Sequence, residues 1–252
     1  MTGDTTQQVA LVTGASEGLG KHIAFEYARR GFAVMLCARR EELLRENCAV
    51  IADSGGIAQY KVCDVRDPNQ IKAVVKETLA TYRRIDVAIL NAGVGSRVVF
   101  SDLDIDEYLR IIDVNLNSVM RFFAALVPVM KAQGSGTIAG VSSLLDSRPI
   151  PGSSVYVASK AALSTLLESA AIELQPHNIQ VVTVRPGFVA TAMTAQNKLR
   201  MPMLMSVERA ARIIVDGIIK GKKTISFPMP MAFLSSLMKV LPRWLWRRLF
   251  PQ

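Results

Sequence analysis

Short apolar runs and longer amphipathic segments alternate along the chain. The runs are rich in Val, Ile, Leu and Ala and show little polar alternation, whereas the segments between them have the period of a helix. Strands of this kind are typical of a parallel sheet that helices cover on both faces. We therefore predict an α/β fold with a single doubly wound parallel sheet, whose strands are residues 9–13, 33–37, 57–63, 86–90, 136–141, 179–184 and 224–227.

The composition fits one folded domain. The chain has 252 residues, of which half are hydrophobic and a fifth are charged, and this length allows a sizeable core. No internal repeat or Pro/Gly/Ser-rich linker divides the sequence. We predict a disordered N-terminus over residues 1–7, one domain over 8–227, and an apolar and basic C-terminal extension over 228–252.

The cysteines and histidines suggest neither disulfides nor a metal. Cys37, Cys48 and Cys63 form no C-x-x-C pair, and His22 and His177 stand far apart. We expect no metal site and three free thiols in a reducing compartment. The polar N-terminus lacks the order of a secretory signal, so we expect a cytoplasmic protein.

A glycine-rich turn follows the first predicted strand. Residues 13–20 read Thr-Gly-Ala-Ser-Glu-Gly-Leu-Gly and lead into a helical run. Glycines let the backbone approach a diphosphate, and the N–H groups of a helix N-terminus favour negative charge. An ordinary strand-to-helix loop can have the same composition. If the turn is a dinucleotide site, its binding residues are Gly14, Ser16, Glu17, Gly18, Leu19 and Gly20.

The end of the second predicted strand favours NADPH over NADH. A site for NADH places a carboxylate there to hold the ribose hydroxyls, whereas this strand ends in Ala38-Arg39-Arg40. Arg39, with Arg40 beside it, is a candidate to bind the 2′-phosphate of NADPH through a charge-assisted bond. Glu17 opposes this interpretation, because it stands where a basic residue would help the phosphate. NADH therefore stays an alternative.

A tyrosine and a lysine lie four residues apart in a predicted helix over residues 153–173. Tyr156 and Lys160 therefore share one helix face. A nearby ammonium favours the phenolate, so we expect it to lower the tyrosine pKa from its ordinary value of about 10. Such a phenol is suited to act as a general acid in carbonyl reduction. A simple surface contact would give the same spacing.

With the motifs described above and those that follow, residues 8–227 resemble the short-chain dehydrogenases/reductases. The glycine-rich turn resembles the cofactor loop of that family, Asp64-Val65 its adenine contact, and Asn91-Ala92-Gly93 the loop after its fourth strand. The motifs occur in the family's order. The resemblance implies a Rossmann fold and an oxidoreductase that uses NADPH or NADH.

The resemblance also implies a catalytic tetrad of Asn115, Ser143, Tyr156 and Lys160. In the family's scheme Tyr156 donates the proton and Ser143 orients the substrate oxygen. Lys160 holds the nicotinamide ribose and tunes the tyrosine, while Asn115 keeps a water in the proton relay. We expect the neighbouring Ser142 to end its strand and turn inward. The matching nicotinamide loop contains Pro186, Gly187, Val189 and Thr191.

The segment at about 190–206 corresponds to the family's substrate lid. It is rich in methionine, a flexible residue that suits either an adaptable apolar wall or packing in the core. The methionines are Met193, Met201, Met203 and Met205. An apolar wall implies a bulky hydrophobic substrate.

The C-terminal extension predicts an amphipathic helix. Its basic stripe comprises Lys239, Arg243 and Arg247, and its apolar stripe comprises Phe233, Leu237, Leu241 and Leu245, with Trp244 and Trp246 in addition. The net charge of the chain is +9, and the segment after Ile219 has basic residues but no Asp or Glu. The helix fits a membrane surface, or another subunit of the homodimer or homotetramer usual in the resembling family. We expect no nucleic-acid binding, because no recognition module is present.

These features predict hydride transfer between nicotinamide and a ketone or secondary alcohol. The expected substrate is a hydrophobic carbonyl compound, such as a 3-oxoacyl chain, a keto-lipid or a steroid-like ketone. One alternative is an NAD-dependent alcohol dehydrogenase of small substrates. Another is a cofactor-binding regulatory protein without significant turnover.

Overall fold

The computed structural model describes residues 7–95, 100–195 and 201–248, so the N-terminus predicted to be disordered lies almost wholly outside the described residues. Within them, the predicted strands are all present, and their bounds differ from the prediction by two residues at most. The strands are β1 (Val9–Thr13), β2 (Ala33–Ala38), β3 (Ile57–Val62), β4 (Val87–Leu90), β5 (Gly136–Val141), β6 (Ile179–Pro186) and β7 (Thr224–Phe227).

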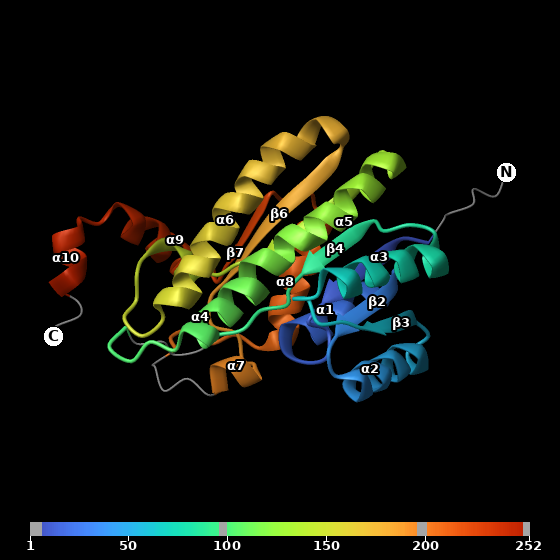
Figure 1. The fold of residues 1–252 in the computed structure, drawn as a ribbon, viewed down its shortest axis with the longest axis horizontal. Helices are drawn as coiled ribbons and strands as arrows, with labels where there is room; N and C mark the ends of the chain where they lie inside the picture. The colour runs from blue at the N-terminus through green and yellow to red at the C-terminus, as the bar shows by residue number, and fades with distance from the viewer. Residues whose placement is uncertain (1–6, 96–99, 196–200, 249–252) are drawn as a thin grey trace.

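The strands form one parallel sheet in the order β3-β2-β1-β4-β5-β6-β7. The order reverses between β1 and β4, and ligands of such sheets bind at the carboxyl ends of the strands beside this point. All strands run the same way, so their carboxyl ends bring the following loops to one edge (Figure 1). The predicted doubly wound parallel sheet is confirmed.

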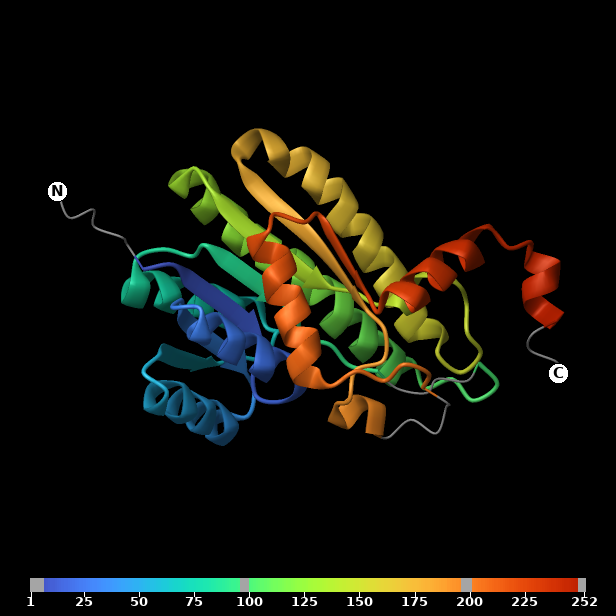
Figure 2. The same cartoon turned by 180° about the vertical axis from the view of Figure 1, so that it is seen from behind.

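Helices cover both faces of the sheet (Figures 1 and 2). On one face α1, α2 and α8 bury side chains such as Ile23 and Ile214, and on the other α3, α5 and α6 bury Phe122 and Leu167. The helices are α1 (Gly18–Arg29), α2 (Glu41–Asp53), α3 (Pro68–Tyr82), α4 (Ile105–Ile112), α5 (Ser118–Gln133), α6 (Ser154–Leu174), α7 (Ala192–Ala195), α8 (Val207–Ile219), α9 (Met229–Val240) and α10 (Arg243–Arg248).

Helices α4 and α5 are joined without a break by a π-helical turn, η1 (Asp113–Asn117). Together they form a helix over residues 105–133 that is, among the described residues, long and apolar enough to cross a membrane by length and composition. Its buried residues Val119, Phe122 and Leu126 belong to the core under the sheet. A core helix of a folded domain therefore accounts for this apolar stretch.

The C-terminal extension differs from the prediction of one continuous helix. Helix α9 ends at Val240 and α10 begins at Arg243. Pro242 lacks an N–H donor and disfavours a helical conformation of the residue before it, and Leu241 is indeed extended, with φ −63° and ψ 132°. The predicted apolar stripe from Phe233 to Leu245 is thus interrupted between α9 and α10.

Candidate active site

A cavity opens at the carboxyl edge of the sheet. Its volume is about 460 Å³, which is within the range of small-molecule and cofactor sites. The loops after β1, β2, β3, β4, β5 and β6 contribute to its wall. The predicted cofactor residues that line it are Gly14, Ser16, Glu17, Gly18, Leu19, Arg39, Arg40, Asp64, Val65, Asn91, Ala92, Gly93, Tyr156, Lys160, Pro186, Gly187, Val189 and Thr191.

The match between the prediction and the cavity wall has exceptions. Gly20, Asn115 and Ser143 are not part of the wall but lie against residues that are. The wall also contains residues that were not predicted to bind the cofactor: Ala38, Cys63, Val94, Val114, Val141, Ser142, Ala192, Met193 and Thr194. Most of these residues adjoin a predicted motif at the carboxyl end of a strand. Their position next to such a motif could have been used to predict them.

The glycine-rich turn has the geometry that a diphosphate requires. Gly14 has φ +66° and Gly18 has φ +57°, a region that side chains other than glycine rarely adopt. A Cβ on Gly20 would lie 2.3 Å from the carbonyl oxygen of Gly14, so the turn closes tightly only with glycine there. Glu17, which precedes α1, does not cap the helix with its side chain. The first N–H groups of α1 are therefore suited to an anionic ligand.

The charges beside this turn are arranged asymmetrically. Arg40 forms an ion pair with Glu17, with Nη2 and Oε1 2.7 Å apart, and donates a hydrogen bond to Ser16 Oγ at 2.9 Å. Arg39 is exposed at the end of β2 and forms no ion pair within the described part of the chain. Arg40 therefore offsets the unfavourable charge of Glu17, and the charge of Arg39 stays available to a ligand.

A buried hydroxyl ties the cofactor loop after β1 to the loop after β4. Thr13 Oγ1 accepts hydrogen bonds from the N–H groups of Asn91 and Ala92, both at 3.0 Å, and donates to the carbonyl of Ile89 at 3.3 Å. The side-chain amide of Asn91 donates in return to the carbonyl of Thr13 at 3.1 Å. These bonds set the two loops at the crevice between β1 and β4.

Asn115 is fully buried in the π-helical turn and holds the loop after β4. Its Oδ1 accepts from the Val94 N–H at 2.8 Å, and its Nδ2 donates to the Val94 carbonyl at 2.9 Å and to Ser159 Oγ at 3.0 Å. A Cβ on Gly93 would lie 3.4 Å from both Asn115 Oδ1 and Lys160 Nζ. Such π-helical turns often occur at functional sites. The water relay remains a prediction.

Lys160 is buried on α6, one turn after Tyr156. Its Nζ donates a hydrogen bond to the carbonyl of Val141 at 2.8 Å and lies 5.8 Å from the centre of the Tyr156 ring. Burial disfavours the charged ammonium and lowers the pKa of Lys160 to about 8. The side chain is therefore placed beside the tyrosine ring, close to the cavity wall at Gly93.

The environment of Tyr156 corrects the expectation that its pKa is lowered. Burial raises the pKa of Tyr156, a hydrogen bond with Ser143 lowers it, and the charge of Asp146 raises it further, so the net direction is upward. The Lys160 ammonium points at a backbone carbonyl rather than at the phenol oxygen. A tyrosine of raised pKa stays protonated near neutral pH and can donate a proton.

The two serines beside the tyrosine have different orientations, as predicted. Ser142 turns inward, where its Oγ donates to the carbonyl of Lys160 at 2.9 Å and lies 2.7 Å from Ser164 Oγ. Ser143 Oγ accepts from the N–H of Leu145 at 3.1 Å and bonds with Tyr156. Ser143 and Tyr156 thus present two hydroxyls together, which can stabilise negative charge on a carbonyl oxygen and supply a proton.

Comparison with known proteins agrees with this geometry. The family model for short chain dehydrogenases matches residues 8–201. The chain belongs to the short-chain dehydrogenase family. It is 34% identical over 239 residues to an uncharacterized oxidoreductase of Myxococcus xanthus, covering 95% of this chain and 94% of the relative. It is 32% identical to 11-beta-hydroxysteroid dehydrogenase-like 3 of Arabidopsis thaliana, covering 95% and 79% of the two chains.

A solved structure of the family also superposes on the chain. A metagenomic short-chain oxidoreductase in complex with NADP is 33% identical, with a TM-score of 0.73, and the match covers 82% of this chain and 88% of that one. The protein is therefore an NAD(P)-dependent dehydrogenase or reductase with a Rossmann fold. Its cofactor belongs to the nicotinamide class, and the glycine-rich turn and crevice described above fit such a group.

The segment of this short-chain dehydrogenase that was predicted to be a lid, at about 190–206, is described only in part, since residues 196–200 lie outside the described residues. Val189 pairs with Met205, which is buried at 8% exposure. Met193 is 46% exposed and lines the cavity, close to Gly95 and the Tyr156 ring. The two interpretations of the methionines therefore each hold for one residue, Met193 facing the cavity and Met205 packing in the core.

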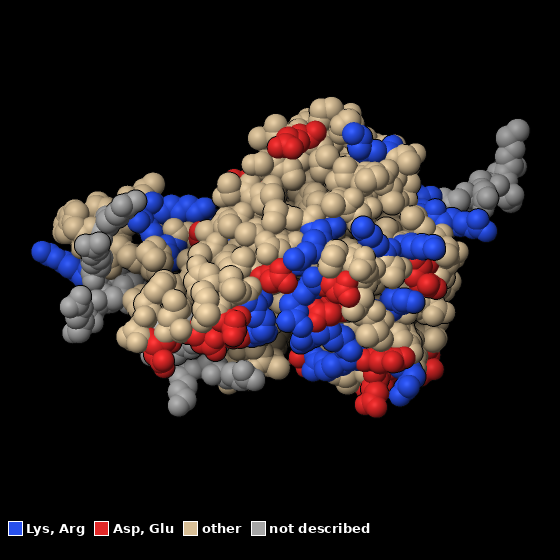
Figure 3. Space-filling view, in the orientation of Figure 1, with Lys and Arg blue, Asp and Glu red and all other residues tan. Residues whose placement is uncertain are grey.

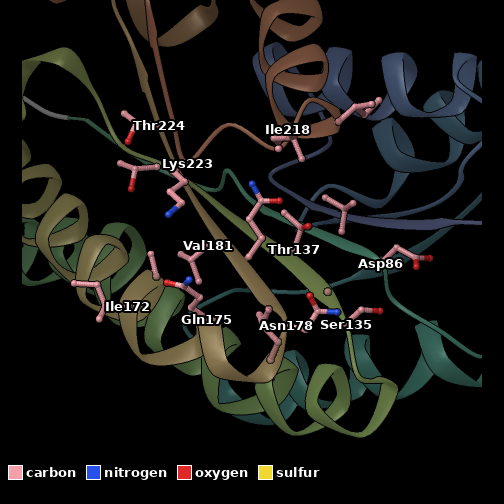
Figure 4. A pocket seen from close by; sticks show the side chains of 18 of the residues that line it. Asp86, Ser135, Thr137, Ile172, Gln175, Asn178, Val181, Ile218, Lys223 and Thr224 are labelled. Carbon is pink, nitrogen blue, oxygen red and sulfur yellow. The ribbon is translucent and has the colours of Figure 1, made fainter.

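A larger hollow, of about 790 Å³, lies at the opposite, amino edge of the sheet (Figure 4). Thr137, Val181 and Thr224, near the starts of three strands, are among the residues that line it. None of the predicted cofactor or tetrad residues contributes to it. Ligands of such sheets bind at the carboxyl ends of the strands, so the smaller cavity is the candidate active site.

Proposed function

We propose that this short-chain dehydrogenase is an NADPH-preferring reductase of a hydrophobic ketone. The main support for NADPH is that Arg39 is exposed at the end of β2 and forms no ion pair within the described residues. The β2 end holds no carboxylate that would repel a 2′-phosphate. Arg40 offsets the charge of Glu17, which supports NADPH, since Glu17 was the feature of the sequence that opposed it.

The residues of the cavity would divide the work of carbonyl reduction. Bound NADPH supplies the hydride. Ser143 and Tyr156 donate hydrogen bonds to the substrate oxygen as negative charge develops there, and Tyr156 then releases its proton to that oxygen. Lys160, 5.8 Å from the tyrosine ring, would hold the ribose and favour the phenolate left behind. Because the pKa of Tyr156 is raised, the phenol stays protonated near neutral pH before the transfer to the substrate oxygen.

The hydrophobic substrate is supported by the apolar surroundings of the cavity. Met193 faces it from the lid, and the Met231 sulfur of α9 would lie 3.2 Å from a Cβ on Gly187 in the nicotinamide loop. Methionines adapt to bulky apolar groups. The Arabidopsis relative carries the name of a hydroxysteroid dehydrogenase, which agrees with a steroid-like or lipid ketone.

The test is single-turnover oxidation of bound cofactor across ketones graded from short and polar to long-chain acyl and steroidal. We expect faster reaction with NADPH than with NADH and with long apolar ketones than with short polar ones. Preference for NADH and small alcohols would instead indicate an NAD-dependent alcohol dehydrogenase. Cofactor binding without turnover of any ketone would indicate a regulatory protein.

We further propose that the C-terminal extension rests on an anionic membrane surface. The outward side of α9 and α10 is apolar, with Phe233 73%, Val240 76% and Trp244 62% exposed. The chain has no Asp or Glu after Ile219, and Figure 3 shows blue basic side chains among the tan surface at this end of the molecule. Apolar residues flanked by Lys and Arg fit the surface of an anionic bilayer.

The same observations favour a bilayer over a second copy of this chain. A two-fold dimer through the extension would place the same basic segment on both sides of the contact, and the segment holds no carboxylate to pair with it. The inner side of the extension already contacts its own chain, since Trp246 Nε1 donates to the carbonyl of Pro149 at 3.0 Å. A homodimer or homotetramer through other surfaces remains a prediction, as does a cytoplasmic location at the membrane.

A further inference from the structure

Two buried charged residues outside the tetrad connect its parts. Asp146 is in the 3-10 turn η2 (Leu144–Ser147), which begins directly after Ser143, and Arg185 immediately precedes Pro186 of the nicotinamide loop. Arg185 Nε and Nη2 donate to Asp146 Oδ2 and Oδ1 at 2.7 and 2.5 Å. The Arg185 side chain is 11% exposed and that of Asp146 1%. A buried bidentate pair of this kind has a defined geometry.

The Asp146 carboxylate also binds the helix that carries the tyrosine and lysine. Ser164 Oγ of α6 donates to Oδ2 at 2.6 Å, and Ser147 Oγ donates to Oδ1 at 2.9 Å. Ser164 in turn lies 2.7 Å from Ser142 Oγ. One carboxylate therefore joins β6, η2 and α6, which hold the nicotinamide loop, the tetrad serine and the tetrad tyrosine.

Helix α9 of the C-terminal extension is bonded to the same turn. Ser235 Oγ donates to the carbonyl of Leu144 at 2.9 Å and lies 2.7 Å from Ser147 Oγ. Arg148, next along the chain, donates from Nε to the carbonyl of Met238 at 2.5 Å. The position of α9 is thus linked by hydrogen bonds to the segment that follows Ser143.

We propose that Asp146 and Arg185 are positioning residues, which set Ser143 relative to the nicotinamide loop and couple both to helix α9. The inference rests on the proposed reductase activity. Reduction requires the substrate oxygen at Ser143 and Tyr156 while its carbon faces the nicotinamide. Misplacement of such groups by about 1 Å costs on the order of 100-fold in rate.

The central experiment neutralises the pair together, as Asp146→Asn with Arg185→Gln. A single change would leave a buried charge without its partner and destabilise the fold strongly, whereas the double change leaves no charge unpaired. We expect the double variant to unfold near the wild-type temperature and to bind NADPH with wild-type Kd. Its kcat for a ketone is expected to fall on the order of 10- to 100-fold.

A matched control changes an ion pair at the amino edge of the sheet. Arg84 donates from Nε and Nη2 to the Asp86 carboxylate at 2.9 and 2.6 Å, far from the cavity. The Arg84→Gln/Asp86→Asn variant should keep its kcat. Wild-type kcat in the folded Asp146/Arg185 double variant would overturn the inference and leave the reductase proposal intact. A wild-type protein that reduces no ketone would overturn both.

A milder variant keeps the inference testable if the double variant does not fold. Ser235→Ala removes the bond from α9 to the Leu144 carbonyl and leaves the buried ion pair in place. We expect a lower kcat at unchanged NADPH affinity, with the unfolding temperature lower by a few degrees because the buried Leu144 carbonyl loses a donor. Ser236→Ala, one residue further along α9, removes only a bond to the carbonyl of Ala232 within the same helix and should leave kcat unchanged. Equal kcat in the two serine variants would contradict the coupling.

Discussion

Lys160 donates a hydrogen bond from Nζ to the carbonyl of Val141 across 2.8 Å, and this bond holds the ammonium beside the tyrosine ring rather than at its hydroxyl. Lys160 is only 4% exposed. One hydrogen bond offsets little of the cost of burying a charge, which explains why the pKa falls to about 8. The group is therefore close to losing its proton at mildly alkaline pH.

This depressed pKa predicts a pH dependence of stability. Below about pH 8 both the folded and the unfolded chain hold the proton, and the folded state carries the full cost of the buried charge. Between that value and the unfolded pKa of about 10.4, only the unfolded chain stays protonated, so stability rises with pH, by about 3 kcal/mol at most. The difference in the free energy of urea unfolding between the wild type and Lys160→Met should rise with pH over this range, because the other titrating groups, such as Cys48, are common to both proteins. Parallel curves would contradict it.

Arg39 should determine the choice between the two nicotinamide cofactors. Arg39→Gln removes a charge-assisted bond to the 2′-phosphate and is expected to weaken NADPH binding on the order of 10- to 100-fold, with NADH affinity unchanged. Fluorescence titration with each cofactor measures both. Arg45→Gln, on the exposed side of α2 and outside the cavity wall, is the matched control. Equal losses for NADPH and NADH would show that Arg39 acts on the fold instead.

The Thr13 hydroxyl should be important for stability. Thr13→Val leaves the half-buried N–H groups of Asn91 and Ala92 without their acceptor. An unsatisfied buried group costs about 1–3 kcal/mol. Because these two N–H groups are only half-buried, we expect the free energy of unfolding to fall by about 1–3 kcal/mol in total. Thr165→Val is the control, because its exposed hydroxyl bonds only to the carbonyl of Ala161 within α6. Similar losses in both variants would contradict the role of Thr13.

The C-terminal extension should bind anionic vesicles. The wild type is expected to sediment with vesicles of phosphatidylserine and phosphatidylcholine, less with phosphatidylcholine alone, and less again at high salt. Phe233→Ser with Val240→Ser removes two exposed apolar groups of α9 and should abolish sedimentation, whereas Ile172→Ser, exposed on α6, should not. Failure of the wild type to bind would refute the proposal. A wild-type dimer that the α9 variant dissociates would identify the surface as a subunit contact.

Much of the fold was predictable because it depends on local patterns. Buried parallel strands produce apolar runs without alternation, and β1 with its glycine-rich turn shows this directly. Strand β3 is the weaker case, since it lies at the sheet edge and its Ile57 and Val62 are partly exposed. Tyr156 and Lys160 were paired from their spacing on one helix, whereas Asn115 and Ser143 were predicted from the resemblance to the family.

The errors arose where three-dimensional environment outweighs local sequence. The spacing of Tyr156 and Lys160 indicated a lowered tyrosine pKa, but burial raises it and the lysine bonds to Val141. The Asp146–Arg185 pair joins residues 39 positions apart, so no local sequence motif predicts it. Pro242 was visible in the sequence, yet the periodicity of the extension suggested one helix across it.

The most direct test of the central claim is ketone reduction by the wild type and Tyr156→Phe, with NADPH affinity measured alongside. The phenylalanine keeps the ring over Lys160 but has no proton to donate. The account predicts that turnover falls on the order of 100- to 10,000-fold while the NADPH Kd changes little. A Tyr156→Phe variant that reduces the ketone at the wild-type rate would contradict the assignment of Tyr156 as the proton donor.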